Sequence, residues 1–512
     1  MAQIRQTNRK TGIVYVYEAE PFWDKERKQS RYLNRKMIGH IDPDTGELVP
    51  NRPLKPAPAA PSSARLFYGA TNLLDQLANQ IGLDKDLTKS MGDDAAKAIL
   101  SFAQFLICQE PAPASRFNLW ARTHAHRLDQ ELSSQRLSEL FASIKQPAIQ
   151  AFFRARAKRA GNDYWFFDTT SISSYSQLLK KVRWGKNKDG VPLPQINLAV
   201  VKDATTGLPL SFKDVPGNIA DVTLVKQLLA DFDNYETGRV KLCLDRGFYS
   251  QTNIDGLMDA HMKFLIGVRT GLNYVKQTLD EHHHDLRSPE CYSEDRDVYG
   301  LRLAHPWTPA GQETTKRSYL HLYYDPQRAV DEEKTLSKLI IKLHHELDTG
   351  QTTPDHKNLY TKFFHKTKTG WAINHDAIEA ERHKHGYFAL LSNDASLDCW
   401  QALDIYRSKD QIEKAFHNIK DRLNLRTTGV HNQETWTGKL FTVFTALILT
   451  TELQCRMKTA GLNKQYTLTE LLDQIETIEQ YRSAGHRPSI LNITKTQTQI
   501  YTKLDTTPPT TS

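Results

Sequence analysis

Two aspartates each follow a short apolar run of the kind that forms a buried strand. Asp168 comes directly after residues 164–167, and Asp245 comes directly after residues 240–244. Ligand sites in α/β sheets form where strands end, so both carboxylates are candidates for such a site. Taken singly, either Asp is explained better as a turn or helix-cap residue. The prediction therefore depends on a third acidic residue.

Glu413 is that third residue, and it lies in a segment, 396–423, whose pattern predicts one long helix. Three further side chains fall within about 40° of Glu413 on such a helix, namely Tyr406, Lys409 and Lys420. An adjoining apolar stripe would pack on the sheet and consists of Ile412, Phe416 and Ile419. Glu413 then lies at the border between core and polar face. The alternative is an exposed Lys–Glu pair of little energetic weight.

Three carboxylates of this kind predict a site for two Mg²⁺ (or Mn²⁺) ions, because hard cations prefer oxygen ligands. Such a metal pair activates an attacking oxygen and stabilises the leaving oxygen in an in-line displacement. The neighbouring cations and phenol suit phosphate contact. We therefore predict Asp168, Asp245 and Glu413 as catalytic metal ligands, and Tyr406, Lys409 and Lys420 as DNA-binding residues that face the substrate.

The order and context of these residues resemble one known family. The Tyr406, Lys409, Glu413 and Lys420 spacing is similar to the Tyr-Arg-Glu-Lys signature of bacterial insertion-sequence DDE transposases. Asp168 in WFFDTTSIS and Asp245 in VKLCLDRGFYS resemble the first and second Asp motifs of these enzymes, and residues 217–221 (GNIAD) resemble a stretch found between them. The resemblance extends from about residue 4 to about residue 453.

This resemblance implies an α/β fold with a ribonuclease H-like mixed sheet, interrupted by a β-rich insertion before the Glu helix. It also implies that an aromatic residue of the insertion can stack on a flipped base, for which the sequence offers Trp307 and Trp371. Core packing is the default for both. One departure is Lys409, which stands where the signature has Arg and lacks the guanidinium fork. Arg407 does not replace it, because on a helix it points roughly 160° away.

The pattern of elements predicts several parts. Strand signals near residues 12–17 and 35–41 precede a Pro-rich stretch, helical periodicity covers residues 64–160, and strands alternate with helices thereafter. We expect a basic β-rich module with a Pro-rich linker at 1–62, a helical DNA-binding region at 63–160, catalytic core at 161–270, an insertion at 271–386, the rest of the core with the Glu helix at 387–430, and a helical C-terminal region with a disordered tail at 431–512.

Composition is that of a soluble globular chain: 512 residues, 39% hydrophobic, with a net charge of +8. The 5 cysteines lack zinc-ribbon spacing. No apolar run is long enough for a membrane span or has the form of a signal peptide, so we expect a cytoplasmic, nucleoid-associated bacterial protein without a membrane partner. Basic residues crowd the segment 145–188 around Asp168, which favours a nucleic acid partner over a merely solvated helix face.

The sequence thus predicts a DNA transposase that binds terminal inverted repeats of an insertion sequence and catalyses metal-dependent strand cleavage and strand transfer. Its expected partners are double-stranded DNA, as transposon ends and target, and a second copy of itself in a synaptic complex. Two alternatives stay open: a ribonuclease H-like nuclease that only cleaves, and an inactive DNA-binding descendant.

Overall fold

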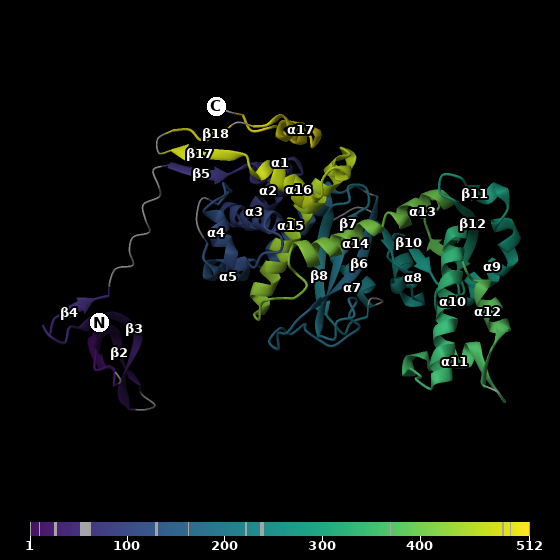
Figure 1. The fold of residues 1–512 in the computed structure, drawn as a ribbon, viewed down its shortest axis with the longest axis horizontal. Coiled ribbons are helices and arrows are strands. Elements are labelled where there is room, and N and C mark those ends of the chain that lie inside the picture. Colours follow the sequence, from purple (N-terminus) through teal and green to yellow (C-terminus); the bar gives the residue numbers. More distant parts are fainter. Residues whose placement is uncertain are drawn as a thin grey trace. The chain divides into compact units, whose positions relative to one another are not determined.

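The computed structural model describes residues 2–9, 11–24, 28–51, 63–128, 132–161, 163–220, 223–235, 240–368, 370–483, 486–491 and 493–510. Contacts divide the chain into two units. Figure 1 labels many of the helices and strands of both. Unit 1 consists of Met1–Arg65 with Tyr481–Ser489, and unit 2 consists of Leu66–Gln480 with Ile490–Ser512.

Unit 1 contains a four-stranded antiparallel sheet in the order β1-β2-β3-β4. Its strands are β1 (Ala2–Thr7), β2 (Val14–Asp24), β3 (Gln29–Ile41) and β4 (Leu48–Pro50). Val16 and Ala19 of β2 are buried, whereas most of this sheet is exposed. A three-stranded sheet has the order β18-β17-β5 and is made of β5 (Ser63–Phe67), β17 (Glu479–Ser483) and β18 (Ser489–Ile490). Most of the predicted Pro-rich linker, residues 52–62, lies outside the described residues.

Unit 2 begins with helices, as the apolar periodicity predicts. They are α1 (Gly69–Gln80), α2 (Leu83–Met91), α3 (Asp93–Cys108), α4 (Phe117–Ala121), α5 (Ser134–Ser143) and α6 (Gln146–Arg159). Helix α3 is buried along most of its length, and both α3 and α5 contact the long helix α15 (Gln433–Thr459). Because they share one hydrophobic cluster with the central sheet, these helices are part of the main core.

The largest sheet in the described part of unit 2 is nine-stranded, in the order β11-β12-β13-β16-β10-β9-β6-β7-β8. Its first half in sequence comprises β6 (Tyr164–Ser173), β7 (Gln195–Asp203), β8 (Pro209–Pro216), β9 (Lys241–Leu244) and β10 (Lys263–Val268). Strands β6, β7 and β8 form an antiparallel meander, whereas β9 runs parallel to β6 and β10 runs parallel to β9. Helices α7 (Leu224–Tyr235) and α8 (Gln251–Asp259) connect the later strands.

Residues 271–386 are not wholly outside this sheet, which corrects one prediction. Strands β11 (Tyr292–Ser293), β12 (Val298–Trp307) and β13 (Lys316–Tyr324) extend it, because β13 pairs along its length with β16 (Tyr387–Ser392). The rest of this segment comprises α9 (Asn273–Leu286), α10 (Pro326–Thr349), α11 (Lys357–Phe363), β14 (Phe364–Thr367), β15 (Gly370–Ile373) and α12 (His375–Arg382). A second, smaller hydrophobic cluster unites α10, α11 and α12.

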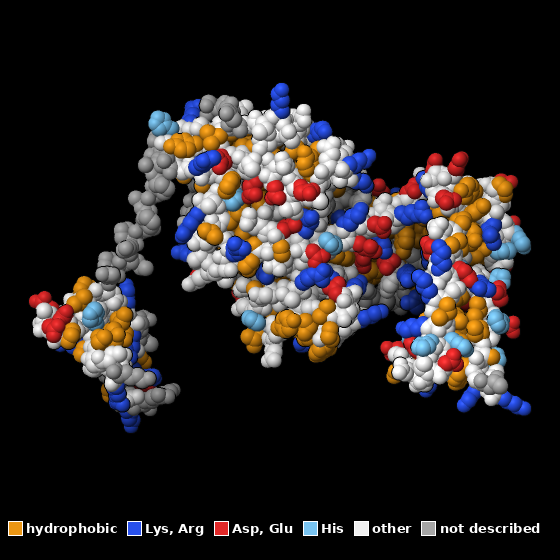
Figure 2. Space-filling model, in the orientation of Figure 1, with side chains coloured by type: hydrophobic (Ala, Val, Ile, Leu, Met, Phe, Trp, Pro, Cys, Tyr) orange, Lys and Arg blue, Asp and Glu red, His pale blue; other side chains and the backbone are white. Residues whose placement is uncertain are grey.

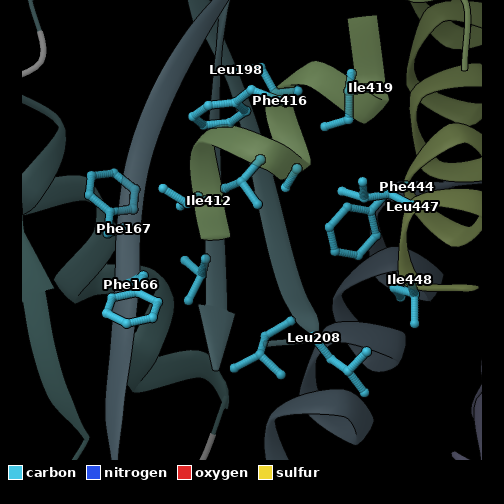
Figure 3. Packing of buried hydrophobic residues seen from close by; sticks show 14 of the residues in the cluster. Phe166, Phe167, Leu198, Leu208, Ile412, Phe416, Ile419, Phe444, Leu447 and Ile448 are labelled. Carbon is cyan, nitrogen blue, oxygen red and sulfur yellow. The ribbon is translucent and has the colours of Figure 1, made fainter. Parts of the chain in front are cut away.

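The predicted single helix at 396–423 is broken. The structure has α13 (Cys399–Arg407), α14 (Asp410–His417) and a π-helical turn, η6 (Asn418–Arg422), with Ser408 and Lys409 between the first two. Figure 3 shows three apolar side chains of α14 and η6 among buried residues of the sheet and α15: Ile412, Phe416 and Ile419. The predicted apolar stripe therefore exists, although the helix that carries it is interrupted.

The C-terminal segment is ordered, and the prediction of a disordered tail was wrong. After α16 (Leu468–Glu476), residues beyond Thr494 form α17 (Lys495–Lys503), which begins with a capping box between Thr494 and Gln497. Tyr501 is fully buried and donates a hydrogen bond to the Gly69 carbonyl at 2.6 Å. The polar, Thr-rich composition of this segment gave no sign that Tyr501 would be buried. Among the described residues, no helix is both long and apolar enough to cross a bilayer.

Candidate active site

Asp168 and Asp245 lie side by side because β6 and β9 are parallel and in register. Phe167 pairs with Leu244, so the next residue on each strand is one of the two aspartates, and neighbouring strands lie about 4.8 Å apart. Asp245 directly follows β9, as predicted. Asp168 is the fifth residue of β6 and pairs with Val200, so it lies within a strand and not after one.

Asp245 is held by two side chains from the predicted signature. The Tyr406 hydroxyl donates to Oδ1 of Asp245 at 2.9 Å, and Nζ of Lys409 lies 2.9 Å from the same oxygen. Burial would raise the pKa of Asp245, but the charge and hydrogen bond of Lys409 and the Tyr406 hydroxyl outweigh it, so the pKa is lowered. Gly267 makes room for Tyr406, since a Cβ there would lie 2.4 Å from the phenolic oxygen.

Asp168 is more buried than Asp245, with a side chain 14% exposed. Burial raises its pKa and Asp245 adds to the rise, against Lys188, the Thr169 N–H and Lys409. The Thr169 N–H donates to Oδ1 at 2.7 Å, and Nζ of Lys188 lies 3.8 Å from that oxygen. Lys188 was not singled out from the sequence. The basic run around Asp168 was the available signal, because one member of such a run is expected near an acidic centre.

Glu413 lies on the exposed face of α14, apart from these contacts. Within the described residues, its side chain makes no hydrogen bond or ion pair, and no group of three His, Cys, Asp or Glu residues is placed to hold a metal ion. The pair Asp168 and Asp245 fits a hard divalent cation by its donor type and closeness. The structure thus brings two of the three predicted ligands together, while Lys409 occupies one of their oxygens.

Lys420 is buried and faces a carboxylate, contrary to the prediction that the stripe is open to substrate. Its Nζ lies 2.7 Å from both carboxylate oxygens of Asp189, and its side chain is only 8% exposed. Lys409 is buried as well. The break before α14 and the π-turn change the helical phase, so the four signature residues no longer share one exposed stripe.

Asp189 belongs to the loop 174–194, which joins β6 to β7 and is fastened to the site. Lys188 Nζ donates to the Thr169 carbonyl at 2.7 Å, and backbone hydrogen bonds join Arg183 and Gln195 in both directions. The loop exposes three large apolar side chains, Tyr175, Leu178 and Trp184, by 74%, 75% and 67%. An anchored loop with exposed aromatic and basic residues suits contact with bases and phosphates.

The two insertion tryptophans have less access to a substrate. Trp307 is buried and donates from its indole nitrogen to Asp255 at 2.7 Å, and Trp371 is partly buried beside the small cluster of α10 and α11. For Trp307 the default of core packing is confirmed.

Close backbone contacts explain why glycine stands in the Gly-Asn motif. A Cβ on Gly217 would lie 2.2 Å from the Gln195 carbonyl, and one on Gly185 would lie 1.9 Å from the Gly217 carbonyl. The motif thus allows three backbone segments to meet beside β7. Asp221, the last residue of the motif, lies outside the described residues.

Much of the predicted basic run is neutralised within the fold. Arg156 is buried and lies 3.3 Å from Asp86, and Arg159 lies 2.7 Å from the same carboxylate. Lys181 pairs with Asp214 at 2.8 Å. Figure 2 shows basic and acidic side chains intermixed on the viewed face. Composition therefore overstates how much positive charge is free for a nucleic acid.

An α/β sheet that sets two carboxylates side by side beside lysines is a site suited to phosphoryl chemistry. The family model "Transposase DDE domain" matches residues 165–449, which include Asp168, Asp245 and Glu413. The match covers more than half of the chain, so the chain belongs to the DDE transposase domain family. Members of this family generally use divalent metal ions.

A cryo-EM structure of a piggyBac transposase synaptic complex with hairpin DNA is similar, with 10% identity and a TM-score of 0.37, over 80% of this chain and 76% of that chain. No curated protein matches the sequence.

Proposed function

We propose that this chain is the transposase of a bacterial insertion sequence, of the Tyr-Arg-Glu-Lys group. In this proposal it binds the terminal inverted repeats of its element, cleaves DNA strands and joins the ends to target DNA. The observation that carries the proposal is the register of β6 and β9, which sets Asp168 beside Asp245 in a chain of the DDE family. The strand order β8-β7-β6-β9-β10 supports a ribonuclease H-like core.

Asp168, Asp245 and Glu413 would hold two Mg²⁺ or Mn²⁺ ions. Metal bound there activates the attacking oxygen and stabilises the leaving oxygen. The chain itself orients Asp168 through the Thr169 N–H and keeps Asp245 ionised through Lys409. The Lys409 ammonium lies 2.9 Å from Oδ1 of Asp245 and would have to leave that oxygen for a cation to bind it.

The test is cleavage and joining of DNA that carries the element's own ends, with purified full-length protein and Mg²⁺. Single replacements Asp168→Ala, Asp245→Ala and Glu413→Ala should abolish cleavage and leave DNA binding intact, because each removes an oxygen ligand. Asp410→Ala is the matched control, since Asp410 is an exposed acid at the start of the same helix as Glu413. Near-normal cleavage by a triad variant would remove that residue from the proposed site.

The same assay separates transposition from cleavage alone. A transposase yields joined products in which a transposon 3′ end is linked to target DNA, whereas a nuclease yields only cut strands. An inactive DNA-binding descendant binds the ends without either product. Synapsis of two ends by two copies of the chain is part of the proposal, and is measured as a complex that contains both ends.

A further inference from the structure

A cavity of about 910 Å³ lies between the end of β7, α14 and the last turns of α15. Its walls come from the end of β7 and the turn that follows, from α14 and η6, from the last turns of α15, and from the segment leading into α16. Asp168, Asp245 and Glu413 are not among its lining residues. The residues that matter for its chemistry are Lys202, Lys414, His417, Arg422 and Lys458.

The lining is basic and contains no Asp or Glu. Arg422 forms an ion pair with Glu110, which does not line the cavity, and His417 lies 3.1 Å from Asp421. Lys414 and Lys458 are exposed, and within the described residues neither side chain has a hydrogen bond or ion-pair partner. The cavity therefore presents uncompensated positive charge, which favours an anionic ligand.

Lys202, near the end of β7, is a further basic residue of the cavity wall. It is only 2% exposed at the end of β7. Burial lowers the pKa of Lys202 to about 8, with the Cys455 thiol acting in the opposite direction and the positive charge of Lys414 adding to the lowering.

The cavity shares its edge with the helix that carries Glu413. Ile412 and Phe416 turn into the core, whereas Glu413, Lys414 and His417 remain on the exposed side of α14. Lys414 directly follows Glu413 on α14 and lines the cavity, so a strand bound at Glu413 passes close to the cavity.

We propose that this cavity binds the phosphodiester backbone of a DNA strand next to the position of cleavage, through Lys414 and Lys458. The proposal rests on the proposed function, because it needs DNA at Glu413. Ammonium groups make charge-assisted hydrogen bonds to phosphate oxygens without reading bases. The contact is therefore expected to be independent of sequence.

The experiment measures duplex binding by full-length protein in EDTA as a function of salt, for wild type, Lys414→Gln and Lys458→Gln. Each variant should bind about tenfold more weakly near 0.1 M salt, and the slope of log affinity against log salt should fall by about one. Lys338→Gln is the matched control, because Lys338 is an exposed lysine on α10 without a partner among the described residues. Both test lysines are exposed, so thermal unfolding should match wild type.

Wild-type affinity and slope in both variants would overturn the proposal, even if wild type cleaves and joins DNA normally. A reduced slope in the variants, together with no cleavage by wild type in Mg²⁺, would keep the DNA site and overturn the proposed function. Acetylation of lysines provides a second readout: a duplex should protect Lys414 and Lys458 but not Lys338. Protection by tripolyphosphate and not by duplex would assign the cavity to a small anion and overturn the DNA proposal.

Discussion

Asp168 and Asp245 are neighbours whose pKa values shift in opposite directions. Burial dominates at Asp168 and raises its pKa, whereas Lys409 and Tyr406 prevail at Asp245 and lower it. Lys409 thus neutralises one carboxylate of a close acidic pair, which would otherwise repel each other. In the Tyr-Arg-Glu-Lys signature this position is Arg, and an Arg could hold a carboxylate and a phosphate with its planar fork.

Variants of Lys409 that lose its positive charge should therefore differ from one that keeps the charge and adds the guanidinium fork. Lys409→Met should raise the pKa of Asp245, because the nearest positive charge is lost, so that Asp245 protonates at higher pH than in wild type. Cleavage should fall in Lys409→Met and Lys409→Ala, and should be kept or improved in Lys409→Arg. Carboxylate titration by NMR in metal-free protein and a cleavage assay check both. Unchanged titration and cleavage in all three variants would mean that Lys409 has no role at the site.

At the scale of elements, short contacts tie strands and loops to the site. Asp394, just after β16, accepts a hydrogen bond from the Tyr164 hydroxyl at 3.1 Å and lies 3.0 Å from Nζ of Lys241. Tyr164 and Lys241 are the first residues of β6 and β9 and pair with each other. One carboxylate thus clamps the ends of the two strands that carry the aspartates of the site.

Asp394→Asn should lower the free energy of unfolding at pH 7 by about 1–3 kcal/mol. Burial opposes ionisation, but Ser396 and Lys241 lower the pKa of Asp394 to about 2, below its ordinary 3.8. Because the folded pKa is lower, the contribution is present above about pH 4 and is lost as pH falls toward 2. Urea unfolding at pH 7 and pH 3 checks this. A difference between wild type and variant that does not shrink at the lower pH would contradict it.

The pair of Lys420 and Asp189 fastens the loop 174–194 to η6. Lys420→Ala should lower stability by about 1–3 kcal/mol, because it leaves a partly buried carboxylate without its partner. Asp189→Asn should have a similar effect, and the double variant should lose less than the sum.

Duplex binding by the same variants tests the predicted DNA contact of Lys420. If Lys420 also contacts a phosphate, its replacement should reduce the salt slope by about one, whereas Asp189→Asn should leave the slope unchanged. Equal slopes in wild type and both variants would mean that Lys420 only holds the loop through Asp189 and does not contact DNA.

At the scale of the whole molecule, the units differ in how they are held. Unit 2 has one continuous hydrophobic cluster that joins its N-terminal helices, the sheet and α15 to α17, whereas the sheet of β1 to β4 is mostly exposed. Stability should therefore reside in unit 2.

Removal of residues 1–62 should leave the melting temperature within about 2 °C of wild type, because it removes little buried apolar surface. Truncation after Thr494 is the contrasting variant: it removes Tyr501 and Ile500, both buried, and should lower the melting temperature by more than about 5 °C. Calorimetry of both truncated chains checks the pair. A larger loss from the N-terminal deletion than from the C-terminal one would reverse this assignment.

Local pattern by itself determined several features of this protein. Apolar runs marked β6 and β9 and hence both aspartates, the stripe of Ile412, Phe416 and Ile419 marked the face that packs on the sheet, and the order of motifs indicated the family. These features depend on residues a few positions apart, whose backbone preferences and burial need no distant partner.

Only the tertiary structure decided the features that depend on distant partners. β13 joins the main sheet because it pairs with the free edge of β16, and β12 follows by pairing with β13. Thr-rich residues after 494 form α17, where Tyr501 has a buried acceptor at Gly69. Lys409 and Lys420 turn to Asp245 and Asp189 because a break and a π-turn alter the helical phase that a regular repeat assumes. Burial and ion pairing are properties of the assembled core, and a local pattern cannot contain them.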